Sequence, residues 1–145
     1  MSYSITIRVY QTNPNAFFDV VEQTVWNFAN GGTWEDVKGQ KVLTMGGSGT
    51  SGTLRFKNTE PDAGAGENFV VAVGVHNYKR WCDIVPDVPN NETGVVINPK
   101  YYHDWSGRRE KQLSSFSTTS ATGRKLSIDY TSPDGHNLVA NIVIG

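Results

Sequence analysis

Apolar and polar residues alternate along much of the chain with a period of two. In residues 3–9, Ile5 and Ile7 are flanked by Ser4, Thr6 and Arg8, as in a β-strand with one face on a core. Similar runs cover residues 24–28, 53–56 and 126–131, and every second residue of 138–144 is apolar and lies on one face. Residues 42–45 are a short apolar run, and residues 69–75 are apolar on both faces. The pattern predicts a mainly β fold, an antiparallel sandwich or barrel.

Turn-forming residues separate these runs. They occur at residues 30–32, 46–47, 64–66 and 132–135, and all four segments contain glycine, which favours turns. The polar stretch of residues 58–67 is predicted to be a hairpin loop within one domain.

One segment suggests a helix. The apolar positions follow the helical spacing i, i+3, i+4 and i+7, at Tyr78, Trp81, Cys82 and Val85. Asn77 could cap the amino end, and Pro86 follows the last of them. A second short helix is predicted from residue 90 or 91 to before Pro99. The sequence therefore predicts a helix-loop-helix insert between strands.

Composition narrows the class of protein. The 145 residues predict a single domain, residues 1–145, and the net charge of −1 argues against binding to nucleic acid. Cys82 is the sole cysteine, which excludes an internal disulfide. The sequence begins with no secretory signal and contains no apolar run long enough for a transmembrane segment, so we expect a cytoplasmic protein, with unconventional export as the alternative.

The sequence gives little support for a catalytic or cofactor-binding motif. Residues 47–52 fit G-x-G-x-x-G, but a strand pattern follows in place of a helix, which argues against a dinucleotide site. His76, His103 and His136 lack the spacing of a metal site, and we expect no cofactor. A glycosidase needs two facing carboxylates; the candidates are Glu35, Asp36, Asp83 and Asp87. Nothing else indicates catalysis, so we expect a protein that is not an enzyme.

Small, amide and aromatic residues gather at three breaks in the strand pattern. They occupy residues 28–34, 46–52 and 75–81. Sugars combine hydroxyls that donate and accept with C–H faces that stack on rings, so these residue types suit a sugar site. Alternatively, Trp26, Trp34 and Trp81 belong to the core and Asn77 is only a helix cap.

At these residues the chain resembles the fungal fruit-body lectins, the Agaricus-type mushroom lectins. The resemblance rests on SITIRVYQT (4–12), FANGGTW (28–34), LTMGGSGTSG (43–52), GVHNYKRWCDIV (74–85), VVINPKYY (95–102) and NLVANIVIG (137–145). These blocks follow the family order over essentially the whole chain.

The resemblance implies a two-sheet antiparallel β-sandwich, similar in shape to the actinoporin cytolysins, with a helix-loop-helix. It also implies a homotetramer that binds glycans and glycoproteins at two sugar sites per protomer. The first site takes the T-antigen disaccharide Galβ1-3GalNAc or GalNAc alone, and its motif positions are Ala29, Ser48, Gly49, His76 and Asn77. Asn77 would bind the axial hydroxyl of galactose-type sugars.

The second implied site takes terminal GlcNAc, and here the chain departs from the family. Asp83 and Ile84 agree, but Pro86 replaces a threonine and Phe116 replaces a tyrosine. Arg108 is our choice for the site's arginine, with Arg109 as the rival. Because two hydroxyl contacts are lost, we expect GlcNAc binding to be weaker by one or two decades.

The shape shared with actinoporins leaves an alternative, a membrane-active cytolysin. That class inserts an amphipathic amino-terminal helix, whereas the amino terminus here has the period of a strand. A lectin is the leading interpretation, with a role in defence against grazing animals as a further implication of the resemblance.

Overall fold

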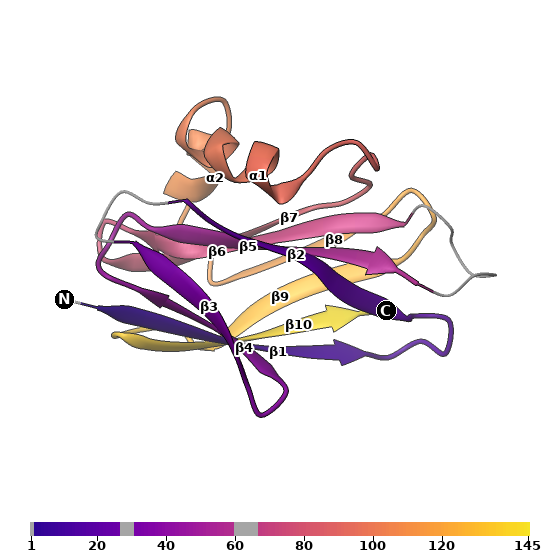
Figure 1. Ribbon diagram of the computed structural model, residues 1–145, viewed down its shortest axis with the longest axis horizontal. Helices are drawn as coiled ribbons and strands as arrows, with labels where there is room; N and C mark the ends of the chain where they lie inside the picture. The colour runs from indigo at the N-terminus through magenta and orange to yellow at the C-terminus, as the bar shows by residue number, and fades with distance from the viewer. Residues whose placement is uncertain (1, 27–30, 60–66) are drawn as a thin grey trace.

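The computed structural model describes residues 2–26, 31–59 and 67–145, which form two stacked β-sheets (Figure 1). The six-stranded sheet has the order β3-β4-β1-β10-β9-β8 and the four-stranded sheet the order β2-β5-β6-β7. The strands are β1 (Tyr3–Gln11), β2 (Phe18–Trp26), β3 (Gly32–Val37), β4 (Gln40–Met45), β5 (Ser51–Asn58), β6 (Asn68–His76), β7 (Lys79–Val85), β8 (Ser115–Thr119), β9 (Lys125–Ser132) and β10 (Asn137–Ile144). The predicted two-sheet β-sandwich is confirmed.

One strand pair differs from the antiparallel prediction. β1 runs parallel to β10, with Ile5 beside Leu138 and Val9 beside Ile142, while the other strand pairs of the described residues are antiparallel. β1 therefore lies inside the six-stranded sheet, between β4 and β10. Its alternating apolar residues face the core between the two sheets.

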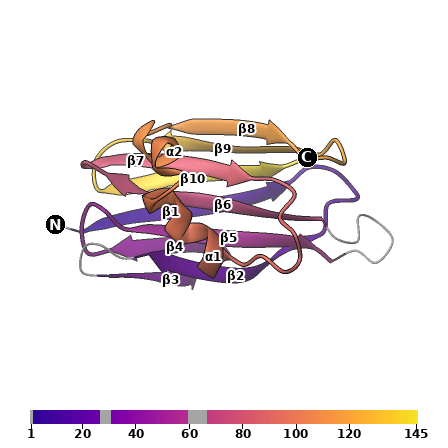
Figure 2. The same ribbon diagram turned by 90° about the horizontal axis from the view of Figure 1, so that it is seen from above.

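The outer face of the four-stranded sheet is covered by the helical insert (Figure 2). The insert consists of α1 (Gly94–Ile97), a 3₁₀ helix, η1 (Asn98–Tyr102), and α2 (Ser106–Glu110). Trp81, Ile97 and Tyr101 are fully buried in a second apolar cluster beneath it. Burial of such large side chains on both faces stabilises β6 and β7.

The prediction of a helix over residues 77–85 is wrong. β6 and β7 form a hairpin whose turn residues Asn77 and Tyr78 both have positive φ, 47° and 66°, as a type I′ turn requires. Asn77 is therefore a turn residue and not a helix cap. The helical spacing arose because β7 is buried on both faces, so its apolar residues do not alternate with polar ones.

The second predicted helix is partly right. α1 and η1 begin a few residues later than expected, and Pro99 lies at the start of η1, where a proline costs no hydrogen bond. The insert is thus a helix-loop-helix, but it follows β7 along the chain. None of the described helices is long and apolar enough to cross a membrane.

Gly74 allows β6 to pack closely against its neighbours. A Cβ atom at this position would lie 2.7 Å from Ser51 Cβ, 2.7 Å from Trp81 Nε1 and 2.8 Å from the Thr50 carbonyl oxygen. No larger residue fits there without moving backbone. The contact fixes the end of β6 that leads to His76.

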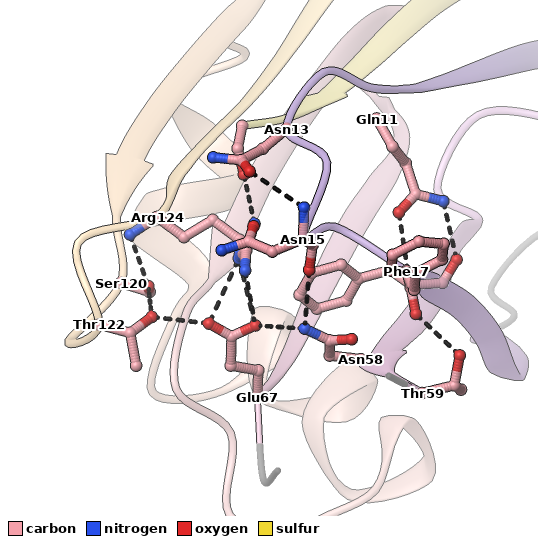
Figure 3. Close-up of polar contacts among 12 residues, drawn as sticks. Gln11, Asn13, Asn15, Phe17, Asn58, Thr59, Glu67, Ser120, Thr122 and Arg124 are labelled. Carbon is pink, nitrogen blue, oxygen red and sulfur yellow. Dashed lines mark hydrogen bonds and ion pairs between the residues drawn. The ribbon is translucent and has the colours of Figure 1, made fainter. Parts of the chain in front are cut away.

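A polar cluster closes the opposite end of β5 and β6 (Figure 3). Arg124 forms an ion pair with Glu67, with 3.1 Å between Nη2 and Oε2, and both side chains are largely buried. Arg124 also donates hydrogen bonds to Asn15 Oδ1 and the Gly145 carbonyl, and Asn58 donates to Glu67. The cluster ties the β1–β2, β5–β6 and β8–β9 connections together.

Candidate functional site

The glycine-rich loop before β5 lies against the β6–β7 hairpin. The Gly49 N–H donates to the Val75 carbonyl (2.8 Å) and the Val75 N–H to the Thr50 carbonyl (3.2 Å). Gly49 has a φ of 105°, which a side chain rarely tolerates. The fold thus brings together Ser48, Gly49, His76 and Asn77, which are far apart in the sequence.

Ser48 and Asn77 present polar groups at this junction. Ser48 Oγ accepts a hydrogen bond from the Tyr78 N–H (3.0 Å), which leaves its hydroxyl hydrogen available to a ligand. Asn77 is exposed, and its amide nitrogen Nδ2 lies 3.3 Å from His76 Nε2. Ala29, the fifth predicted residue, lies outside the described residues.

His76 is held from the insert side. Arg109 Nη1 lies 2.9 Å from His76 Nδ1, and Gln112 Nε2 donates to the His76 carbonyl (2.5 Å). Burial and the positive charge of Arg109 lower the pKa of His76, while Glu110 acts in the opposite direction. The imidazole is therefore neutral over a wider pH range than that of a free histidine.

A hollow of about 530 Å³ continues from this junction along the surface. Its lining is Tyr3, Gly46, Gly47, Ser48, Tyr78, Gly135 and His136. Tyr78 is 79% exposed, although an apolar ring gains by burial. On sequence alone, Tyr78 falls in a predicted helix and His136 is considered only as a metal ligand, because only the fold shows that they border the same hollow as Ser48.

A second cluster lies under α2, at the outer face of β7. Asp83, which is 4% exposed, accepts a hydrogen bond from the Tyr101 hydroxyl (2.8 Å) and lies 3.4 Å from Arg108 Nη1. The Arg108 guanidinium also sits 4.3 Å from the centre of the Trp105 ring. The structure thus places Arg108 beside Asp83, whereas Arg109 points to His76.

The other predicted residues of this cluster are less accessible. The Ile84 side chain faces the opposite way from Asp83, into the core between the sheets, so only its backbone atoms are available to a ligand. Pro86 follows β7 and is half-buried. Phe116 lies in β8, where its ring packs against the core. Phenylalanine also has no hydroxyl, so the Phe116 side chain offers a ligand no hydrogen-bonding group.

The amino-acid sequence of the whole chain matches a known family. The model of the fungal fruit body lectins aligns with residues 1–142. The chain belongs to the fungal fruit body lectin family. A Boletus edulis lectin from this comparison is 52% identical over 146 residues, which covers 99% of each chain.

Solved structures agree with this assignment. Wild-type Xerocomus chrysenteron lectin, XCL, superposes with a TM-score of 0.94 at 55% identity, with 100% of both chains covered. A methionine-substituted variant of XCL gives the same TM-score and identity, with 99% of that chain covered. The predicted family and fold are confirmed, and as a fungal fruit body lectin the chain is a carbohydrate-binding protein.

The carboxylates considered for glycosidase chemistry are dispersed in this lectin. Glu35 and Asp36 are exposed on β3, where Asp36 pairs with Lys41 at 2.6 Å. Asp87 accepts hydrogen bonds from the Ala121 N–H. β3 and the strand of Asp83 belong to different sheets, and lectins of the family are not enzymes.

Asp83 makes stability depend on pH. Burial raises its pKa above the ordinary 3.8, although Tyr101 and Arg108 act in the opposite direction, so the folded protein holds this proton more tightly than the unfolded chain. The free energy of unfolding therefore falls as pH rises and Asp83 loses its proton. We therefore expect the difference in free energy of unfolding between Asp83→Asn and the wild type to shift in favour of the variant from pH 3 to pH 7. Urea titrations at both pH values measure this, with Asp104→Asn on the exposed loop as control; a difference that stays constant contradicts the argument.

Proposed function

We propose that residues 1–145 form a single lectin domain that binds Galβ1-3GalNAc, or GalNAc alone, at the junction of the glycine-rich loop and the β6–β7 turn. Its ligand groups are Ser48, Gly49, His76 and Asn77, together with Ala29. The observation that carries the proposal is the set of hydrogen bonds that join Gly49 to Val75 and Ser48 to Tyr78. They hold a hydroxyl and an amide side by side at the surface.

The chemistry of these groups suits a galactose-type sugar. An axial hydroxyl both donates and accepts, and an amide beside a serine hydroxyl can satisfy it in both directions. A glucose-type epimer would leave these protein groups without partners, which costs more than the hydrogen bond itself contributes. The exposed Tyr78 ring offers an apolar face for the C–H groups of the second sugar.

We infer a second, weaker site for terminal GlcNAc at Asp83, Ile84, Pro86, Arg108 and Phe116. Asp83 and Arg108 are in contact and offer a carboxylate and a guanidinium for sugar hydroxyls. The proline and the phenylalanine supply no hydroxyl, and the Phe116 ring packs inward. The expected result is a lectin with a strong galactose-type preference.

We further propose that the protein acts as a cytoplasmic homotetramer that cross-links glycoproteins. Shallow sugar sites bind weakly one at a time, so several copies in one particle raise the overall avidity. The cytolysin alternative is less well supported, because β1 pairs with β4 and β10 inside a sheet and does not form an amphipathic helix.

A glycan array tests the proposed specificity. We expect signal on Galβ1-3GalNAc and GalNAc, and a signal about ten- to a hundredfold weaker on GlcNAc-terminated glycans. The double variant Pro86→Thr and Phe116→Tyr should strengthen GlcNAc binding without affecting the first site. Equal affinity of the wild type for both sugar classes contradicts the proposed specificity. Silence on every glycan, together with dye release from sugar-free liposomes, favours the cytolysin.

A further inference from the structure

Arg109 lies behind the proposed galactose-type site, where several contacts hold its side chain. Its side chain is only 15% exposed. Its Nε donates to the Tyr101 carbonyl (3.0 Å), and its guanidinium lies 4.6 Å from the centre of the Tyr102 ring. These two contacts leave Nη1 aimed at His76 Nδ1, at 2.9 Å. Arg109 is neither one of the proposed ligand residues of the galactose-type site nor a member of the cluster around Asp83.

The contact fixes the position of the imidazole proton. A guanidinium carries five N–H donors and has no acceptor, so His76 Nδ1 must accept the hydrogen bond. A neutral imidazole with an accepting Nδ1 carries its proton on Nε2. His76 is therefore an Nε2–H donor on the side that faces Asn77.

The orientation of Asn77 follows from that proton. The amide atom placed nearest to His76 Nε2 is Asn77 Nδ2, at 3.3 Å. Two N–H donors do not bind each other, so an Nε2–H donor on His76 requires the Asn77 amide to be turned over about its Cβ–Cγ bond, with the carbonyl oxygen Oδ1 toward His76. The Asn77 NH₂ group then points away from His76, toward the ligand side of the turn.

We propose that Arg109 is a positioning residue that sets the direction of hydrogen bonding in the galactose-type site. The direction runs from Arg109 to His76, from His76 to Asn77, and from the Asn77 NH₂ group to a lone pair of the sugar hydroxyl. The inference rests on the proposed function, because it concerns the same site and its ligand. It assigns Arg109 to this site and not to the GlcNAc site.

Charged side chains around His76 influence whether its ring takes up a second proton. Arg109 and Glu110 come from α2, and Lys79 lies across the hairpin from His76. Arg109 disfavours a second proton on the ring, and Glu110 favours it. Without Arg109, the ring takes up a proton at higher pH, and Nδ1 is free to carry it.

Four proteins test the proposal: the wild type, Arg109→Met, Arg109→Lys and, as a matched loss of a positive charge from the end of the same helix, Lys111→Met. Imidazole ¹⁵N NMR on the sugar-free wild type should show His76 protonated at Nε2 only. Arg109→Met should raise the His76 pKa and weaken Galβ1-3GalNAc binding about tenfold, with a greater loss at pH 5.5 than at pH 7.5. Arg109→Lys keeps an N–H donor, so its affinity and its His76 pKa should lie between those of the wild type and Arg109→Met. Lys111→Met should match the wild type in both.

Two results overturn the proposal. One is a wild-type His76 that carries its proton on Nδ1; the other is a folded Arg109→Met variant with wild-type affinity and an unchanged His76 pKa. If the wild type does not bind the disaccharide, the proposed function fails instead. The NMR result still decides the direction of the hydrogen bonds in that case.

Discussion

Asn77→Gly should reduce binding of Galβ1-3GalNAc by about a hundredfold while the protein stays folded. The variant removes the amide that would bind the axial hydroxyl. Glycine adopts the positive φ of this turn position without strain, so the hairpin is preserved. Isothermal titration with the disaccharide measures the loss, and thermal unfolding measures the stability.

The choice of glycine separates the two roles of Asn77. Asn77→Ala should lose binding to a similar extent, but it should also destabilise the protein by about 1 kcal/mol, because alanine is strained at a positive φ. If Asn77→Gly retains wild-type affinity, Asn77 serves only to form the turn and the proposed site is wrong.

Arg124→Met should lower the free energy of unfolding by about 3 kcal/mol at neutral pH. Arg124 and Glu67 are 8% and 11% exposed, so the variant leaves a buried carboxylate without its cation. Burial alone would raise the pKa of Glu67, but hydrogen bonds from Asn58, Thr122 and Arg124 outweigh it and lower the pKa. The stabilisation is therefore present above pH 4.5 and is lost as pH falls.

Denaturant titrations at several pH values measure this effect. The cost of Arg124→Met should shrink under acid conditions, and a second substitution, Glu67→Gln, should recover part of the loss at neutral pH. Sugar affinity should be unchanged, because the ion pair lies at the other end of β5 and β6 from Asn77. A loss below about 0.5 kcal/mol would show that the pair behaves as an exposed salt bridge.

The sequence is informative where strands have one buried and one exposed face. β1 was predicted because apolar residues such as Ile5 alternate with polar ones, and β10 because every second residue, Ile142 among them, places an apolar side chain on one face. Their parallel pairing could not be predicted, since alternation determines which face is buried and not which strand lies alongside. β3 and β8 were missed because they are short and largely polar.

β7 shows the limit of periodicity. Trp81 and Asp83 face the insert, while Cys82 and Ile84 face the sandwich core, so both faces carry buried residues and no alternation remains. The turn before it lacks glycine, although its φ values favour one. A helix was the natural interpretation of this segment, and only tertiary packing decides against it.

The candidate site could be proposed from motifs, but its supporting contacts could not. Ser48 and Asn77 stand in segments whose composition suits a sugar. The contact between Arg109 and His76 joins residues 33 positions apart, and neighbouring Arg108 turns to Asp83 instead. Which of two adjacent arginines reaches which cluster depends on the path of η1 and α2 over the sheet.

A crystal structure of the complex with Galβ1-3GalNAc tests the central claim most directly. The account predicts the galactose ring against Ser48, Gly49, His76 and Asn77, with its axial hydroxyl within hydrogen-bonding distance of the Asn77 amide. Density for the disaccharide at another place, with this junction free of sugar at saturating concentration, would contradict it.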